Sequence, residues 1–310
     1  MDKKRRMLSI LTRSLGFLLV IYLGYFLKMR KITSQEFGKV LSTIVMNITL
    51  PCAILSSLTP LYFSVTLLIP FILGIFGNML LDFVGYKTHK HSDKLERGVA
   101  VVDNSGFNVG TFALPFIQAV FPASYIFNVI LFDTGNSIMC IRGNYLIAEK
   151  VAYGQEKQSF ASIIKKLFSS IPLCTYLFSL TFSLLHLSIP QEILNITSIA
   201  GNANPFIAML MIGTLVDFHV SKDEFFSLFK RLSYRFLTMG ALAAVVYFLV
   251  PIDLVAKQMV VLCLFAPITT LGPVHSLQLG SKSPEAANLN TLSIFASITL
   301  LTILSLLFVA

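Results

Sequence analysis

The sequence contains little charge. Only 13% of its 310 residues are Asp, Glu, Lys or Arg, whereas a soluble globular domain has about 25%. Hydrophobic residues make up 55% of the chain, and its mean hydropathy is +0.78. This composition excludes an ordinary soluble domain and predicts a membrane protein with many spans. At about 20–25 residues for each span, the chain has room for about ten.

Motifs for enzymes, metals and redox chemistry are missing. The four cysteines form no Cys-x-x-Cys pair, have no histidine at metal-ligand spacing and all fall in apolar runs, so we expect small buried side chains and no metal site. Phosphate-binding loops and the Gly-x-Ser-x-Gly motif are absent. A single Asp-Thr-Gly begins at Asp133, but aspartic proteases need two such carboxylates. We therefore expect no catalytic residues, no cofactor and no enzyme.

Apolar runs and basic loops alternate along the chain. Every second connection, beginning with the one after the first run, carries Lys or Arg, and the remaining connections carry only Lys257. Cytoplasmic loops of membrane proteins are enriched in basic residues. Topology therefore accounts for the net charge of +9, and we expect no nucleic-acid partner. The expected spans are 7–27, 37–58, 61–86, 98–121, 124–148, 164–186, 193–217, 232–250, 255–279 and 286–309.

The same charge pattern predicts an orientation. The basic loops place both termini on the non-cytoplasmic side of the cell membrane. The basic tail from Lys3 to Arg6 favours the opposite orientation, because positive charge beside the first span normally stays inside. The repeated basic loops outweigh this one tail. The run at 7–27 is too long for the apolar core of a signal peptide, and we expect it to be the first span.

The chain also divides into two similar halves. Each half holds five expected spans, and an odd number gives the halves opposite orientations, which is the geometry of an inverted repeat. Proline spacing supports the division, since Pro51 and Pro115 are 64 residues apart and Pro205 and Pro267 are 62 apart. We predict an all-α polytopic fold of ten transmembrane helices in two inverted five-helix repeats. The first repeat, the cytoplasmic loop and the second repeat are expected at 1–148, 149–162 and 163–310.

The expected fourth span has an irregular centre. Between Val99 and Phe121 it contains an acid, amides, glycines and a proline, and freed backbone groups are tolerated at this depth only beside a cavity or within protein. We expect the chain to unwind near Gly110 to Pro115, leaving half-helices whose N–H groups can hold an anion. The alternative is a continuous helix with a Gly-x-x-x-Gly packing face and a proline kink. The candidate substrate-binding residues here are Asn104, Ser105, Gly106, Asn108, Gly110 and Pro115.

The expected ninth span, at 255–279, is interrupted in a similar way between Met259 and Leu279. Pro267 and Pro273 cannot both sit inside one uninterrupted helix. Hydroxyls of Thr269 and Thr270, between the prolines, can satisfy freed carbonyls or contact a substrate. Two interrupted spans in corresponding halves are the best sequence indication of a transporter's binding site. Pro267, Thr269 and Thr270 therefore join the candidate substrate site.

Four polar residues are candidates for coupling to a proton or a sodium ion. Asp133 lies in the middle of the expected fifth span, where a carboxylate is energetically expensive, and Asn136 follows three residues later on the same helix face. Asp103 begins the polar run of the fourth span. His275 follows the ninth-span break and can respond to pH. For each of them the alternative is a structural contact with packed neighbours.

Motifs spread over nearly the whole chain occur in a familiar order. They are Asn-Ile-Thr-Leu-Pro-Cys-Ala-Ile-Leu at 47–55, Asp-Asn-Ser-Gly-Phe-Asn-Val-Gly-Thr-Phe-Ala-Leu-Pro-Phe at 103–116, Phe-Asp-x-Gly-Asn at 132–136, Ala-Asn-Pro at 203–205 followed by Met-Ile-Gly at 211–213, Ala-Pro-Ile-Thr at 266–269, Leu-Gln-Leu-Gly at 277–280 and Pro-Glu-Ala-Ala at 284–287. In this order the chain resembles the auxin efflux carrier family.

The resemblance implies secondary transport of organic anions and the inverted-repeat fold, with broken helices crossing in spans 4 and 9. It implies a scaffold of spans 1, 2, 6 and 7, often dimeric, and a mobile transport unit of spans 3–5 and 8–10. Plant auxin carriers have Asn directly before the fourth-span proline, where this chain has Leu114, and they carry a long cytoplasmic loop. Both departures favour a bacterial malate or malonate permease type over an auxin carrier.

These observations predict a secondary transporter of a small organic anion, a carboxylate, that works by elevator-type alternating access. The expected partners are that substrate, a coupling proton or sodium ion, the lipid bilayer and a second copy of the chain. One alternative is a cation/proton exchanger of the same fold, with Asp133 and Asp103 as ion ligands. Others are a membrane sensor that transports nothing and an intramembrane hydrolase.

Overall fold

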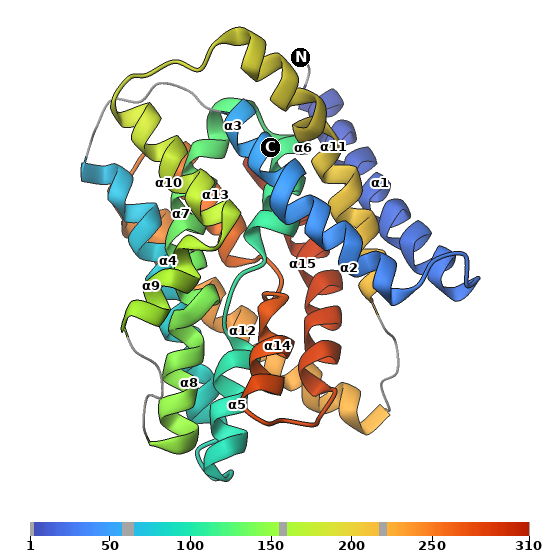
Figure 1. Cartoon of the computed structure of the whole chain (residues 1–310), viewed down its shortest axis with the longest axis vertical. Coiled ribbons are helices and arrows are strands. Elements are labelled where there is room, and N and C mark those ends of the chain that lie inside the picture. Colours follow the sequence, from blue (N-terminus) through green and yellow to red (C-terminus); the bar gives the residue numbers. More distant parts are fainter. Residues whose placement is uncertain (1–2, 58–64, 155–159, 217–221, 310) are drawn as a thin grey trace.

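The computed structural model describes residues 3–57, 65–154, 160–216 and 222–309, and in this part of the chain every regular element is helical (Figure 1). No β-strand occurs among these residues. Within the described residues, each of the ten expected spans lies mainly on one helix or on consecutive helices. The elements are α1 (Lys3–Met29), α2 (Gln35–Ile44), η1 (Val45–Thr49), α3 (Leu50–Ser56), η2 (Val65–Leu67), α4 (Leu68–Thr88), α5 (Lys94–Asn104), η3 (Val109–Ala113), α6 (Leu114–Val120), η4 (Ala123–Tyr125), α7 (Ile126–Ile138), η5 (Met139–Gly143), α8 (Asn144–Tyr153), α9 (Phe160–Phe168), α10 (Ile171–Leu184), α11 (Gln191–Leu215), α12 (Lys222–Leu249), α13 (Leu254–Leu264), α14 (Leu271–Gln278) and α15 (Glu285–Val309).

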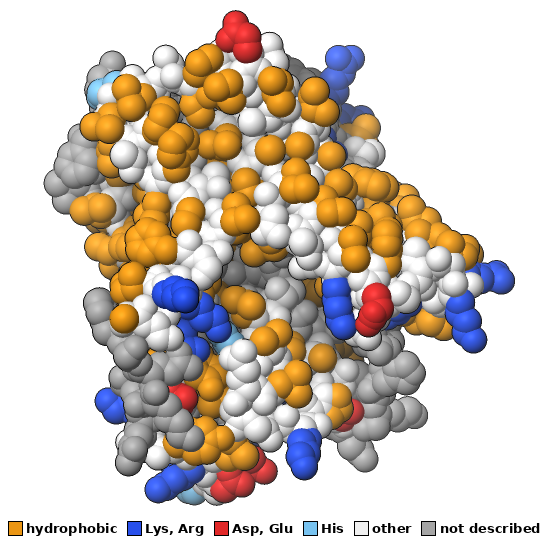
Figure 2. Space-filling model, viewed as in Figure 1, with side chains coloured by type: hydrophobic (Ala, Val, Ile, Leu, Met, Phe, Trp, Pro, Cys, Tyr) orange, Lys and Arg blue, Asp and Glu red, His pale blue; other side chains and the backbone are white. Residues whose placement is uncertain are grey.

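Six helical stretches in the described residues are long and apolar enough to cross a membrane, as expected for a helical membrane protein. The outer surface agrees, because large apolar side chains such as Phe206, Leu237 and Phe248 are exposed, and apolar side chains cover much of the face in Figure 2. Ten spans and an inverted repeat stay predictions, since shorter helices make up the other expected spans. The six stretches are 4–29, 35–56, 68–88, 191–215, 224–249 and 285–309.

Several expected boundaries differ from the observed ones. The run expected at 164–186 is two helices, because the Ser170 side chain accepts a hydrogen bond from the Leu173 N–H at 3.4 Å and starts a new helix, bent by 79° from α9. The helix expected to begin at 232 begins at Lys222. The connection expected at 149–162 is shorter, since α8 runs to Tyr153 and α9 begins at Phe160. Residues 58, 61–64, 155–159 and 217, which belong to expected spans or to the expected loop, lie outside the described residues.

Two glycine pairs bring helix axes close together. A Cβ at Gly24 or Gly213 would collide with the backbone of the facing helix where α1 packs on α11. A Cβ at Gly74 or Gly135 would do the same where α4 packs on α7. Helices of membrane proteins gain close backbone contact through such small residues. The packing therefore forms one group of α1, α2, α3 and α11 and another that contains α4, α5, α7 and α8.

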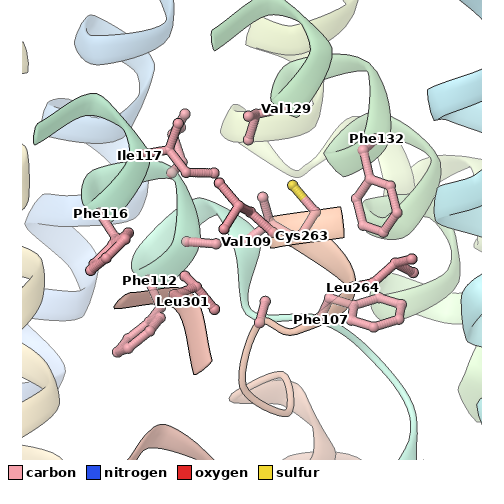
Figure 3. Packing of buried hydrophobic residues seen from close by; sticks show 14 of the residues in the cluster. Phe107, Val109, Phe112, Phe116, Ile117, Val129, Phe132, Cys263, Leu264 and Leu301 are labelled. Atoms are coloured by element: carbon pink, nitrogen blue, oxygen red, sulfur yellow. The ribbon is translucent and has the colours of Figure 1, made fainter. Parts of the chain in front are cut away.

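The buried core lies where the two interrupted segments meet their neighbours. Figure 3 shows Val109, Phe112 and Ile117, from η3 and α6, beside Cys263 and Leu264 of α13. All five side chains are at most 1% exposed. This dense packing surrounds the irregular backbone and keeps its polar groups away from lipid, as the energetics of a membrane interior require.

Candidate functional site

Two non-helical stretches lie side by side at the centre of the molecule. The first joins α5 to η3 at residues 105–108, and the second joins α13 to α14 at 265–270. The Asn108 N–H donates a hydrogen bond to the Pro267 carbonyl at 2.8 Å. The two breaks predicted from the sequence therefore touch each other. A single continuous helix through Gly106 and Gly110, the alternative for the fourth span, does not form.

The first break lies earlier than expected. We expected unwinding near Gly110 to Pro115, but η3 makes a π-helical turn there and continues into α6. Pro115 lies in the first turn of α6, where its missing N–H is tolerated, and the Leu114 N–H reaches back five residues to the Val109 carbonyl. Helix α5 instead ends at Asn104, and Gly106 follows within the break with a φ of +79°, which favours glycine.

The Asn136 side chain holds the first break in place. Its amide donates to the Phe107 carbonyl at 2.8 Å, and its oxygen accepts from the Phe107 N–H at 3.1 Å. The same oxygen accepts from the Asn78 amide of α4 at 3.0 Å. Asn136 is 2% exposed, so these bonds replace the water that a freed backbone group otherwise needs. Asn136 therefore stabilises the backbone of the break. Its proposed role in ion coupling is a separate prediction.

Asp133 forms a hydrogen bond between two helices. Its Oδ1 accepts from the Asn136 amide at 2.7 Å, and its Oδ2 accepts from the Tyr176 hydroxyl of α10 at 2.5 Å. Both side chains are buried. Tyr176 received no role from the sequence, because a tyrosine in an apolar run carries no functional signal by itself. Only the fold brings it to Asp133, 43 residues away.

A cavity of about 220 Å³ adjoins the two breaks. The surface drawn in Figure 2 is hollowed near its centre, between α2 and α9 in the matching view of Figure 1. Asp133 is the one formally charged side chain among the described residues that line the cavity. The predicted residues in its wall are Asn108, Gly110, Asp133, Asn136, Thr269 and Thr270. The opposite wall contains Ser42, Met46, Leu50, Ser170, Tyr176, Met211 and Leu215, from α2, η1, α3, α10, α11 and the residue that caps α10.

The first turn of η3 borders this cavity. The N–H groups of Gly110, Thr111 and Phe112 precede the first helical bond, from the Ala113 N–H to the Asn108 carbonyl at 3.2 Å, and so have no acceptor inside the helix. Gly110 and Thr111 line the cavity. The N-terminal end of a helix attracts negative charge. Asp133 lines the same cavity, so a carboxyl group that can hold a proton or a cation lies beside the N-terminal end of a helix.

Other predicted residues lie outside the cavity. The Asn104 amide donates to the Leu81 carbonyl at 3.3 Å. Ser105 is fully buried, and Pro115 lies further along in α6. Gly106 and Pro267 lie in the breaks, where a Cβ on Gly106 would meet Thr269.

Two of the coupling candidates also lie elsewhere. Asp103 accepts a hydrogen bond from the Ser276 hydroxyl and pairs with Arg231 at 3.4 Å. Arg231 also pairs with Glu285 at 3.1 Å. His275 is 3% exposed and its ring packs edge-on against Tyr145, with centroids 5.4 Å apart. The geometry of these contacts favours structural roles for Asp103 and His275.

Arg235 is a second site residue, after Tyr176, that the sequence did not indicate. Its guanidinium donates to the Asn104 carbonyl, to the Gly106 carbonyl at 2.8 Å and to the Ala266 carbonyl at 3.4 Å, so it contacts both breaks. The side chain is fully buried and lies over the Phe107 ring, 5.0 Å from its centroid. The sequence patterns gave Arg235 no role. Its position inside the run at 232–250 was the available signal, because ionisable residues within a span are costly.

Neither the protein-family models nor the curated proteins include a match to this chain. The class of this protein is therefore inferred from its sequence and structure alone. It is an apolar, all-helical chain, as expected for a membrane protein, with two interrupted helices that meet beside a polar cavity.

Proposed function

We propose that this protein is a secondary transporter of a small organic anion, a carboxylate, working by elevator-type alternating access. The observation that carries the proposal is the contact between the two breaks at one wall of a polar cavity. Broken helices in corresponding halves, with half-helix ends at the substrate, are a recurring design of secondary transporters. The cavity's other wall comes from α2, η1, α3, α10 and α11, which correspond to the expected scaffold spans 2, 6 and 7. Sliding of α4–α8 and α12–α15 against this wall would expose the cavity alternately to the two sides.

The substrate is proposed to lie against the first turn of η3. The N–H groups of Gly110 and Thr111 supply donors and the positive end of the helix dipole. Hydroxyls of Thr269 and Thr270 and the polar side chain of Asn108 line the same cavity. The volume of about 220 Å³ favours a small carboxylate. Asn104, Ser105 and Pro115 support the site from behind the cavity in this proposal.

The resemblance to the auxin efflux carrier family supports the same function. It favours a permease of the bacterial malate or malonate type, because Leu114 stands where plant auxin carriers have Asn and the described α8 and α9 are separated by a short connection. The homodimer that the resemblance implies stays a prediction. So does coupling to a proton or to sodium.

We also propose ten spans in two inverted repeats, with both termini on the non-cytoplasmic side of the plasma membrane. The proposal rests on the basic loops. Alkaline phosphatase fused after residue 310 is expected to be active, and the same enzyme inserted at 155–159 is expected to be inactive, because it folds only outside the cytoplasm. A green fluorescent protein reporter at the same two positions should give the opposite pattern. Fluorescence from the C-terminal fusion would contradict this orientation.

Uptake into sealed proteoliposomes tests the function. The purified protein is expected to accumulate at least one radiolabelled C3–C4 carboxylate above the level in protein-free liposomes, with a larger effect under an imposed pH or sodium gradient. Malate, malonate, succinate and lactate form a first panel, and indole-3-acetate serves as the auxin control. Binding of a carboxylate without its movement into the vesicle would favour a membrane sensor and contradict transport.

One observation favours a second candidate, a cation/proton exchanger. Asp133 is the one formally charged side chain among the described residues of the cavity wall, and an intramembrane carboxylate is a natural cation ligand. An exchanger would dissipate a preformed pH gradient on addition of Na⁺ or K⁺ without any carboxylate. Asp133→Asn would abolish that activity, whereas an anion transporter would show no such cation response.

A further inference from the structure

The carbonyl groups of the two breaks converge on one position. Helix α5 ends at Asn104 and α13 ends at Leu264, so their last carbonyls lack partners within the helix and carry the negative end of the helix dipole. Carbonyls from both breaks, those of Asn104, Gly106 and Ala266, bind the same guanidinium. This position is distinct from the anion-binding start of η3, because it uses the C-terminal ends of the half-helices.

Such a set of oxygen atoms has the chemistry of a cation site. Hard cations prefer backbone carbonyl and carboxylate oxygens. In transporters with broken helices, unwound carbonyls and half-helix C-terminal ends coordinate Na⁺. In this protein the position is already filled by a side chain from α12, whose hydrogen bonds and stacking on Phe107 hold it there.

We propose that Arg235 is a built-in cation, which occupies a cation site formed by the carbonyls of both breaks and makes a free metal ion unnecessary there. Arg235 pairs with no carboxylate of the described residues. Its charge is therefore balanced by carbonyl dipoles, as a bound cation's charge would be. This inference rests on the transporter proposed above in one respect only. In that transporter a coupling sodium ion would not bind at this position, and another group, such as Asp133, would bind the coupling ion.

Cation rescue of an Arg235 variant tests the proposal. The measurement is the unfolding temperature of the purified full-length protein in detergent, with choline chloride as the reference salt. Low guanidinium is expected to leave the wild-type unfolding temperature at its value in choline, and the wild-type difference between Na⁺ and choline is the baseline that is subtracted from the difference measured for each variant. Arg235→Ala is expected to unfold about 10 °C lower in choline, since several carbonyls lose their partner. About 20 mM guanidinium or Na⁺ should restore at least half of the loss, because either ion can bind the vacated carbonyls.

Arg142→Ala is the matched control. Arg142 is also buried and lies over an aromatic ring, that of Tyr145 at 4.5 Å, but the structure shows no hydrogen bond from it to a described carbonyl. No cation should rescue its variant. An Arg235→Ala protein that neither guanidinium nor Na⁺ stabilises more than choline does would overturn the proposal.

Two further variants decide the question if Arg235→Ala does not fold. Arg235→Lys keeps the charge and is expected to give folded protein, whereas Arg235→Met keeps the length without the charge and is expected not to. If both variants fold, or if neither folds, the proposal that Arg235 acts as a built-in cation would be overturned. The unfolding temperature does not depend on transport, so failure here leaves the transporter proposal intact, and failure of uptake leaves this proposal intact.

Discussion

Gly106→Ala is expected to abolish carboxylate uptake and to lower the stability of the folded protein. A Cβ at this position would meet the Thr269 side chain, with its Cβ at 2.8 Å, and the Cys140 sulfur at 3.0 Å. The residue also holds φ at +79°, which costs an alanine about 1–2 kcal/mol. Overpacking adds about 1–3 kcal/mol. Because Thr269 lies on the second break, the collision would separate the two breaks whose contact forms the site.

The matched control is Gly154→Ala. Gly154 has nearly the same φ, +75°, but an added Cβ finds nothing within 4 Å. It should cost only the backbone strain, about 1–2 kcal/mol, and leave uptake unchanged. Thr269→Ser removes the colliding methyl group and should partly restore uptake in the Gly106→Ala protein. Wild-type uptake by Gly106→Ala would show that close contact between the breaks is not needed. Uptake assays and thermal unfolding measure both effects.

Asp133→Asn is expected to remove the pH dependence of uptake. In the wild type, a deprotonated Asp133 shares a cavity of about 220 Å³ with the anionic substrate. Two negative charges ~5 Å apart repel by about 3 kcal/mol at an effective dielectric constant near 20, which is roughly a 100-fold loss of affinity. Lower pH protonates Asp133 and removes this repulsion, so wild-type uptake should rise as pH falls. Asparagine is always neutral, so the variant should bind well at every pH.

The groups around Asp133 make it the source of this dependence. Tyr176, Cys140 and Cys263 are the titratable groups found near its carboxyl, and such side chains are ordinarily uncharged at pH 7. Tyr176→Phe is the control, because it removes the hydrogen bond to Oδ2 and keeps the carboxyl group. It should keep the pH dependence. A wild-type pH profile in Asp133→Asn would assign proton coupling elsewhere, and loss of all cation-driven proton movement in that variant would favour the exchanger.

The interruption of two helices could be predicted from local chemistry alone. Glycine and proline weaken a helix wherever they occur, and both expected spans that contain such clusters are broken. The place of the first break could not be predicted. Pro115 is the stronger helix breaker in isolation, yet it lies at the start of α6, where its missing N–H is tolerated. The helix is instead interrupted around Gly106, because the side chains of Asn136 and Arg235 bind the backbone there.

The roles of the charged residues depended on their surroundings. Asp103 and Asp133 look alike in the sequence, each an acid inside an expected span. Asp103 pairs with Arg231, whereas Asp133 faces the cavity. Arg235 lies close to the start of the expected span at 232–250, received no role from the sequence, and is fully buried. The ends of a span can be predicted from sequence only to within several residues. An arginine near such an end can therefore lie either in water or at the centre of the protein, and the sequence does not distinguish the two.

Composition and periodicity by themselves determined that the chain forms apolar helices long enough to span a membrane, with two irregular segments, because hydropathy and helix-breaking residues act locally along the chain. Only the tertiary structure decided that those segments touch, that Asn136 and Arg235 hold them, and that Tyr176 reaches Asp133. These contacts join residues 29 to 159 positions apart. Their free energy arises when distant carbonyls and donors satisfy each other away from water, and no local pattern in a sequence records such a partner.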